Sequence, residues 1–467
     1  MGETSAQVAA GEPATRGESG AAAQPARGAA LGAETTGRPP PSPPEPTTLA
    51  ETGLPHALLE GLMCKTMYRL AIERPSQLAE ALCLPMTLLT ELIDKARDAR
   101  LVEAKGQAEA SVTAEMRWAL TAGGRERALQ ALSQSDYVGP APVPMEQYAF
   151  QVSRQSIRGE TLQRPVLERV FSRLTLSEAV MTRLGPAANS GSSMLLYGPP
   201  GNGKSSIAEA LCQAFGHHVW IPYAIEVDRQ IITLYDPAVH AALPAAEAQR
   251  LAGGSTALRR ARGIDPRWVA CKRPKLIAGG ELTLDMLDLA YSPVSRVYEA
   301  PMQAKAAGGV LVIDDFGRQR QHPQEIINRM IIPLESGEDF LSLNTGRKFL
   351  IPFDSLVVFS TNIAPSELVD DAALRRLRYK ILVDSPDLQT FLKIFATTAK
   401  RANMALTEET LQFVLSELYE NHGKRMQAFH PRFFCDQARA ICAFEGMAPA
   451  LTPDVLIRAW ENLFPVD

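Results

Sequence analysis

The stretch from Met194 to Ser206 reads M-L-L-Y-G-P-P-G-N-G-K-S-S, and the rest of the chain is interpreted outward from it. Its first four residues, Met194–Tyr197, have the apolar and aromatic character of a buried β-strand. A glycine-rich turn follows, and residues Ser205–Phe215 favour a helix. The sequence therefore predicts a strand and a helix joined by a tight glycine turn.

The residues of this turn suit the binding of a nucleotide's phosphates. Glycines let the backbone curl so that successive N–H groups point at phosphate oxygens. Lys204 would provide a charge for the β- and γ-phosphates, Ser205 a hydroxyl for Mg²⁺, and the helix the positive end of its dipole. The predicted nucleotide-binding residues of this P-loop are Gly198, Pro199, Pro200, Gly201, Asn202, Gly203, Lys204, Ser205 and Ser206.

Length and composition set broad limits. A chain of 467 residues is long enough for roughly two to four domains. With 46% hydrophobic and 21% charged residues it resembles a soluble globular protein, and its net charge of −4 predicts no general attraction to nucleic acid or membranes. No apolar run approaches the ~20 residues of a membrane helix. The six cysteines form no C-x-x-C pair, which is typical of a reduced, cytoplasmic protein without a disulfide framework or metal site.

The first 50 residues are predicted to be a disordered tail. They are rich in Ala, Gly, Pro, Thr and Glu, and include R-P-P-P-S-P-P-E-P at Arg38–Pro46. Such a segment cannot bury enough apolar surface to offset the entropy lost on ordering. It also has no apolar core of a secretory signal, and its glutamates argue against a transit peptide.

Residues 51–138 form the next predicted unit, built from helices and two short strands. Its expected helices span residues 58–70, 76–82, 86–100 and a segment after Thr121, with strands at 101–104 and 116–120. This order resembles a winged helix-turn-helix module, so the unit is predicted to be a winged-helix-like domain.

The charges of this unit bear on its partner. Ten lysines and arginines stand against twelve acidic residues, and the third helix offers only Lys95 and Arg97 as positive charges near its exposed positions. A DNA-binding module needs a basic surface for the phosphates. A protein partner is therefore favoured, and DNA is the less favoured alternative. A linker is predicted over residues 139–164, beginning with the stiff segment Gly139–Pro144.

Two more aliphatic strands end in polar residues that suit phosphate chemistry. Gly309–Ile313 is followed by Asp314 and Asp315, and Leu356–Thr361 is followed by Asn362. The carboxyl ends of parallel strands face the ligand in such sheets. Asp314 is predicted to hold Mg²⁺ beside the P-loop serine, Asp315 to polarise the attacking water, and Asn362 to orient that water.

A short predicted helix, Asp371–Arg378, carries clustered arginines. A guanidinium presented at an edge suits a γ-phosphate that a neighbouring subunit holds. Arg375 or Arg376 is therefore expected to act catalytically across a subunit boundary, which makes a homo-oligomer the expected state.

The order of these motifs resembles the AAA+ ATPase superfamily. Gly198–Ser205 matches its Walker A motif, Val310–Asp315 its Walker B motif, Asn362 its sensor 1 residue, and the two arginines its arginine-finger position. The resemblance implies an α/β fold with a P-loop NTPase parallel sheet over residues 165–385, ATP and Mg²⁺ as ligands, and a ring that is most often a hexamer. Most members carry Glu where this chain has Asp315, whose side chain is one methylene shorter.

The last predicted domain, residues 386–467, resembles the helical lid of that superfamily. Its expected helices span residues 387–401, 407–422, 431–444 and 452–463. Pro431 suits the first position of the third helix. By resemblance, Arg432 is the sensor 2 arginine, which closes over the nucleotide.

Two features indicate which branch of the superfamily this chain resembles. A candidate hairpin at Asp339–Pro352, with Asn344-Thr345-Gly346 at its turn, is similar to the pre-sensor hairpin of MoxR-like and related AAA+ proteins. Residues 221–307 exceed one strand plus one helix, so they are expected to contain an insertion that contacts a substrate or partner.

Three functions remain open at this point. The favoured one is ATP hydrolysis that drives remodelling of a protein partner, as a chaperone does. The first alternative is a nucleic-acid-directed ATPase, such as a transcription or replication regulator, that binds DNA through its winged helix. The second is a scaffold that binds ATP as a switch and barely hydrolyses it.

Overall fold

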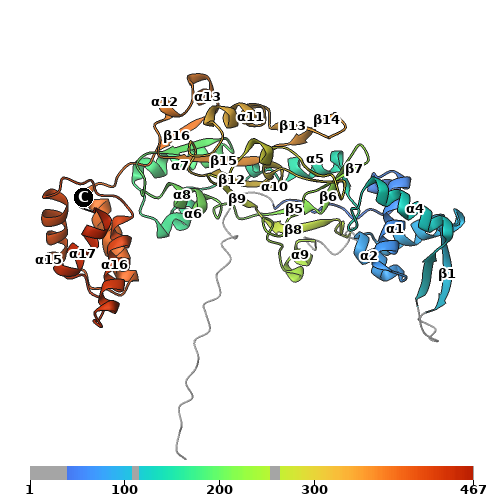
Figure 1. Cartoon of the computed structure of the whole chain (residues 1–467), viewed down its shortest axis with the longest axis horizontal. Helices are drawn as coiled ribbons and strands as arrows, with labels where there is room; N and C mark the ends of the chain where they lie inside the picture. Colours follow the sequence, from blue (N-terminus) through green and yellow to red (C-terminus); the bar gives the residue numbers. More distant parts are fainter. Residues whose placement is uncertain (1–38, 108–114, 253–262, 466–467) are drawn as a thin grey trace, which may run out of the picture.

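The computed structural model describes residues 39–107, 115–252 and 263–465. Figure 1 shows three parts along the long axis: a helical domain from the C-terminal region, an α/β body in the middle, and a small module from the N-terminal region. The predicted tail lies outside the described residues as far as residue 38. No described helix combines the length and the apolar character that crossing a bilayer requires.

A five-stranded parallel sheet forms the centre of the body, which confirms the predicted fold class. Every neighbouring pair in it runs parallel. The strand order is β16 (Tyr379–Leu382), β4 (Met194–Tyr197), β15 (Ser355–Thr361), β12 (Gly309–Ile313) and β9 (Lys275–Ala278). The P-loop strand β4 and the acid-bearing strand β12 therefore both flank β15, which carries Asn362 at its end.

Helices cover both faces of this sheet, which is why its strands read as continuous aliphatic runs. Met194 and Leu196 pack on one face and Leu195 on the other, as the alternation of side chains along a strand requires. The first face is covered by α6 (Arg164–Val170), η4 (Phe171–Arg173), α7 (Glu178–Asn189) and α8 (Lys204–Leu211). The second is covered by α10 (Met302–Lys305), α11 (Pro323–Ser336), α12 (Pro365–Leu368) and α13 (Asp371–Arg376).

Residues 221–307, where an insertion is expected, contribute four strands to a second, mixed sheet beside the first, and residues 143–144 contribute the fifth. Its order is β10 (Ala290–Ser292), β11 (Val297–Glu299), β7 (Gln230–Thr233), β6 (Ala224–Val227) and β3 (Val143–Pro144). The same region contains the antiparallel pair β5 (His218–Pro222) and β8 (Trp268–Lys272), with α9 (Ala245–Ala252) and η5 (Leu284–Leu287). The predicted hairpin is present as β13 (Glu338–Ser342) and β14 (Lys348–Pro352). Its MoxR-like character stays a prediction.

The predicted linker over residues 139–164 does not hold as a free connection. Its strand β3 pairs with β6, and α5 (Met145–Arg154) packs Tyr148 fully into the core of the second sheet. A 3₁₀ turn, η3 (Ile157–Gly159), then leads to the central sheet. The prolines of residues 139–144 indicate a linker, but the apolar face of the helix that follows them anchors this segment to the sheet.

The N-terminal module has the element order that the sequence predicts. It contains α1 (His56–Leu70), α2 (Pro75–Leu82), α3 (Met86–Asp98), β1 (Val102–Gln107), β2 (Met116–Leu120) and α4 (Ala122–Gln134). Its assignment as a winged-helix-like domain stays a prediction. The predicted disorder is wrong for residues 39–50, because Leu49 is buried in the module's core and η2 (Ala50–Thr52) follows it.

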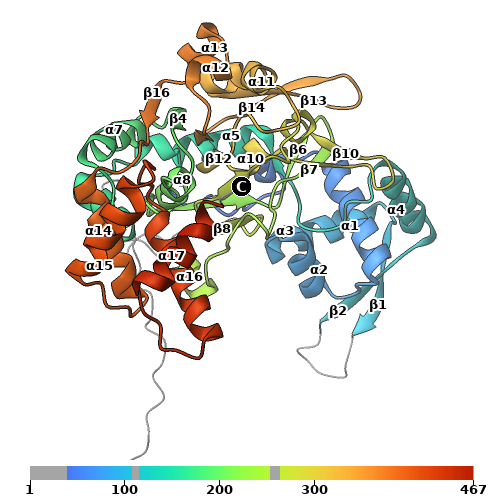
Figure 2. The same cartoon turned by 60° about the vertical axis from the view of Figure 1, so that its left-hand side comes forward.

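The four expected helices of the lid are all present. They are α14 (Leu388–Arg401), α15 (Glu408–Phe413) continued by a π-helical turn at Val414–Glu420, α16 (His430–Phe444) and α17 (Pro453–Leu463). Aromatic rings fill the space between them, with Phe434 stacked on Trp460. In Figure 2 the lid and the N-terminal module both project below the body.

His430 should make the lid's stability depend on pH. Its Nδ1 lies 2.6 Å from the Tyr419 hydroxyl, and burial lowers the pKa of His430 from 6.5 to about 4. In the unfolded chain His430 is protonated below about pH 6.5, whereas in the folded lid it is protonated only below about pH 4. The stability of the lid therefore falls as the pH drops from 6.5 towards 4. Between pH 7.5 and 5 the loss should be about 2 kcal/mol.

Hydrogen exchange of α16, corrected for the intrinsic rate, measures this loss. The dependence should shrink in His430→Phe, which has no titrating ring. Equal protection of α16 at both pH values would contradict the expectation.

Candidate functional site

The predicted P-loop connects β4 to α8 at the carboxyl edge of the central sheet. Gly198, Gly201 and Gly203 have φ angles of 135°, 76° and 87°, a region that residues with a side chain rarely adopt. A Cβ on Gly198 would lie 2.5 Å from the Val383 carbonyl oxygen, which is too close for any side chain. This position therefore requires glycine for a second reason. The helix ends at Leu211, four residues before the predicted end.

Lys204 joins the P-loop to the neighbouring strand. Its ammonium donates to the carbonyl oxygens of Gly198 and Pro199, both at 2.9 Å, and to Asn362 Oδ1 at 2.6 Å. Only 6% of the residue is exposed, and this burial lowers the pKa of Lys204, against the opposing effect of Asp314 and Asp315. The site therefore contains a desolvated positive charge, held where sequence reasoning placed the β- and γ-phosphates.

Ser205 and Asp314 meet, as the predicted metal pair requires. The Ser205 hydroxyl donates to Asp314 Oδ1 at 3.0 Å, although 109 residues separate them in the chain. A hydroxyl and a carboxylate are hard oxygen ligands that fit Mg²⁺, which usually completes its shell with water and substrate phosphates. Among the described residues, no group of three or more His, Cys, Asp or Glu side chains could hold a metal by itself.

Asp315 follows Asp314 in an unusual backbone conformation. Its φ is 48°, in the left-handed region that few non-glycine residues occupy, and its side chain is exposed. The turn is held in place by the Phe316 amide, which donates to the Ser360 carbonyl on β15. Strained residues of this kind gather at functional sites. The structure thus presents the Asp315 carboxylate at the same sheet edge as Lys204 and Asn362.

The lid contacts the P-loop through residues that the sequence reasoning missed. The Ala428 amide donates to Asn202 Oδ1 at 3.1 Å, and the Asn202 side chain is buried. The Phe429 ring covers Gly201, where an added Cβ would lie 2.2 Å from a ring carbon. The only signal in the sequence was the position of Gln427-Ala428-Phe429 just before the helix that begins at His430.

Three predicted arginines do not reach this site within one chain. The Arg376 guanidinium pairs with Glu335 on α11 at 3.0 Å, and Arg375 is exposed at the end of α13. Arg432 pairs with Asp436, one turn further along α16, and its side chain is 83% exposed. The structure therefore brings Lys204, Ser205, Asp314 and Asn362 together and leaves the arginines at the surface.

Two family models match the chain. Residues 169–341 match the AAA ATPase domain, and residues 387–462 match a domain of unknown function (DUF8689) that spans the lid helices. No match was found among curated proteins.

Two of the similar solved structures are those of NtrX and RuvB. NtrX from Brucella abortus in complex with ADP is 14% identical over 74% of this chain and 68% of that chain, with a TM-score of 0.37. A RuvB mutant from Thermotoga maritima is 13% identical over 64% of this chain and 70% of that chain, with a TM-score of 0.35. The match to the AAA ATPase domain spans both the P-loop and the Asp314 strand, so residues 169–341 are similar to an ATPase domain of this family.

Proposed function

We propose that this protein binds Mg·ATP at residues 198–206 and hydrolyses it to remodel a protein partner. The convergence of Lys204, Ser205, Asp314 and Asn362 at one sheet edge carries the proposal. These groups lie just beyond the ends of three different strands, β4, β12 and β15. A buried lysine ammonium under the electrostatic influence of a nearby carboxylate indicates a site prepared for a charged ligand.

The residues have distinct roles in the proposed reaction. Lys204 would exchange its carbonyl partners for the β- and γ-phosphate oxygens, and Ser205 with Asp314 would hold the metal. Mg²⁺ would neutralise charge that develops on the phosphates. Asp315 would accept a proton from the attacking water, and Asn362, whose Oδ1 already touches Lys204, would orient that water.

The positions of Arg375 and Arg376 support the proposal of an oligomer. Arg375 is exposed on α13, away from the P-loop of its own chain, so a second copy is the natural receiver of its charge. A guanidinium supplied in this way stabilises the charge of the transferring phosphoryl group. We propose a homo-oligomeric ring, with a hexamer as the expected size.

The charges of the module favour a protein partner over DNA. On α3, Lys95 pairs with Glu91 at 2.9 Å and Arg97 with Asp94 at 3.1 Å, so acidic neighbours already neutralise both cations. A helix in this state offers little to a phosphate backbone. Binding of the full chain to duplex DNA that weakens steeply with salt would instead favour the nucleic-acid-directed alternative.

Replacing Asp315 by Asn should separate binding from turnover. The amide cannot accept the proton of the attacking water, so the rate of ATP hydrolysis should fall by a factor of roughly 10² to 10⁴. Binding of Mg·ATP should persist in this variant and be lost in Lys204→Ala. Steady-state turnover and equilibrium binding of a fluorescent ATP analogue measure both quantities. Turnover that survives in Asp315→Asn would rule out this base, and a parent protein without turnover would favour the switch-like scaffold.

Mixing two inactive variants should restore hydrolysis if the arginines act between subunits. Asp315→Asn has no base but keeps its arginines, whereas the double variant Arg375→Ala, Arg376→Ala has a base but no guanidinium to donate. Some interfaces in a mixed ring contain both an intact Asp315 and the arginines of the neighbouring subunit. The rate of ATP hydrolysis by the mixture should therefore be at least ~10-fold higher than that of either variant alone. A mixture as inactive as its components, shown to co-assemble by light scattering, would contradict the arrangement.

The lid is proposed to close over the nucleotide, with Arg432 swinging from Asp436 to the phosphates. One of its existing anchors is Asn202, so Asn202→Ala should loosen the lid by about 1–2 kcal/mol, the value of a buried hydrogen bond. Exchange of the Ala428 amide should accelerate by roughly tenfold in the nucleotide-free protein. Asn202→Asp keeps an acceptor oxygen and is the matched control. Unchanged exchange in Asn202→Ala would show that the anchor lies elsewhere.

A further inference from the structure

Residues 39–46, P-P-P-S-P-P-E-P, are packed against the body and are here called the proline strap. Pro40, Pro43 and Pro46 are buried, whereas Pro39 and Pro44 are exposed. Burial at every third residue matches the three residues per turn of a polyproline II helix. The buried prolines therefore form one face of the strap, which is turned towards the protein.

The backbone of the strap is hydrogen-bonded to two other elements. Gln151 on α5 donates from Nε2 to the Pro41 carbonyl at 2.8 Å. The Asp265 amide donates to the Pro43 carbonyl at 3.1 Å, and the Glu45 amide to the Gly263 carbonyl at 2.8 Å. A polyproline helix has no internal hydrogen bonds, so its carbonyl groups are free to be recognised in this manner.

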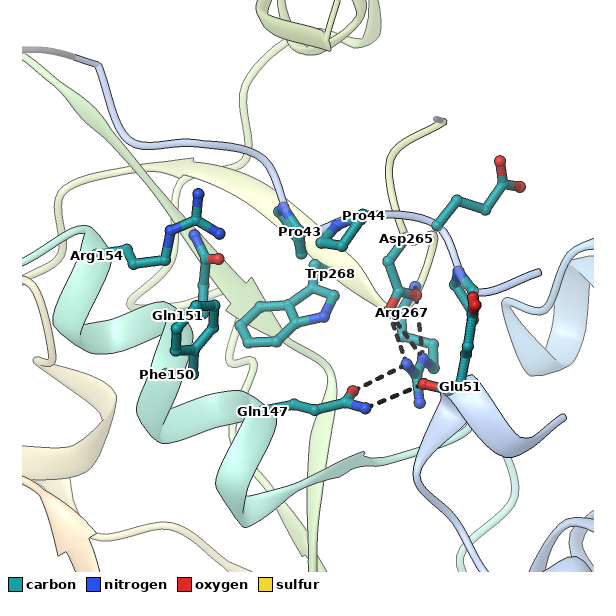
Figure 3. Close-up of a pocket in the computed structure, with 12 residues that line it drawn as sticks. Pro43, Pro44, Glu51, Gln147, Phe150, Gln151, Arg154, Asp265, Arg267 and Trp268 are labelled. Atoms are coloured by element: carbon teal, nitrogen blue, oxygen red, sulfur yellow. Dashed lines mark hydrogen bonds and ion pairs between the residues drawn. The ribbon is translucent and has the colours of Figure 1, made fainter. Parts of the chain in front are cut away.

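A cavity of about 320 Å³ continues the same groove between the strap, α5 and residues 265–268 (Figure 3). Trp268 and Phe150 form its aromatic wall, and the guanidinium of Arg154 lies 5.2 Å from the centre of the Phe150 ring. Phe150 is 62% exposed, which is unusual for a phenylalanine beside a packed segment. Pro43 of the strap lines the cavity next to Trp268.

Aromatic grooves with polar hydrogen-bond donors are the surfaces that recognise polyproline segments. The strap already occupies part of such a groove, and the cavity leaves the Phe150 end of it open. We propose that this groove is a polyproline-recognition site, occupied here by the chain's own strap and able to take a proline-rich segment of a partner protein in its place. This site would act independently of ATP.

Competition with the strap gives the test. The full-length variant Pro40→Ser, Pro43→Ser, Pro46→Ser should free the groove, and a fluorescein-labelled peptide of residues 38–47 should then bind, as measured by fluorescence anisotropy. The unchanged protein should bind the peptide at least ~10-fold more weakly, because a tethered strap competes at a high effective concentration. Pro39→Ser is the matched control: it alters an exposed proline that does not line the cavity, and it should behave like the unchanged protein.

Two further changes test the groove itself. Added to the triple variant, Phe150→Ala should weaken binding of the peptide at least ~10-fold, and because Phe150 is exposed its replacement should leave the fold intact. Trp268→Ala should do the same, with circular dichroism and ATP turnover as checks of folding. A folded triple variant that does not bind the peptide would overturn the proposal. So would binding that Phe150→Ala and Trp268→Ala leave unchanged, or that persists with a peptide whose three buried-face prolines are serine.

Discussion

The predicted nucleotide site depends on a lysine ammonium that is held largely out of water. A buried charge is costly unless hydrogen bonds replace its hydration. Lys204 meets this requirement with two carbonyl oxygens of its own loop and the amide oxygen of Asn362. The same contacts fix the curl of the P-loop and its distance from β15. A phosphate ligand would offer the ammonium stronger, charged acceptors, so the site is prepared for exchange of partners and needs no rearrangement of the sheet.

A second buried charge joins the N-terminal module to the body. Arg267 is almost fully buried and pairs with Asp265 at 2.7 Å. Its guanidinium also donates to the carbonyl oxygens of Thr52 and Pro142, which lie where the chain enters and leaves the module. Removing one partner of a buried pair typically costs about 3–5 kcal/mol, because the other charge is left uncompensated. The module is therefore held in a defined position, beside the proline strap, and does not hang on a free linker.

Local patterns account for the elements that the sequence predicted well. The strand, turn and helix around Gly198, the strand before Asp314 and the lid helices all have a periodicity or a motif within one short window. The strands β3, β6 and β7 are only two to four residues long, so they carry no such periodicity. The strap was misjudged for a related reason. Composition averages over a segment, whereas the burial of Pro40, Pro43 and Pro46 depends on a surface formed more than 100 residues away.

By itself the sequence predicted which residues could bind phosphate, ligate a metal or accept a proton, and it determined the local element in which each of them lies. Only the tertiary structure decided which of these residues meet. Lys204 and Asn362 are 158 residues apart, and their contact exists because β4 and β15 pair in parallel. The contact of Phe429 with Gly201 and the groove beneath the strap likewise join residues that lie more than 100 positions apart in the chain. Pairing and packing depend on the free energy of the whole fold, and no short window of sequence contains that information.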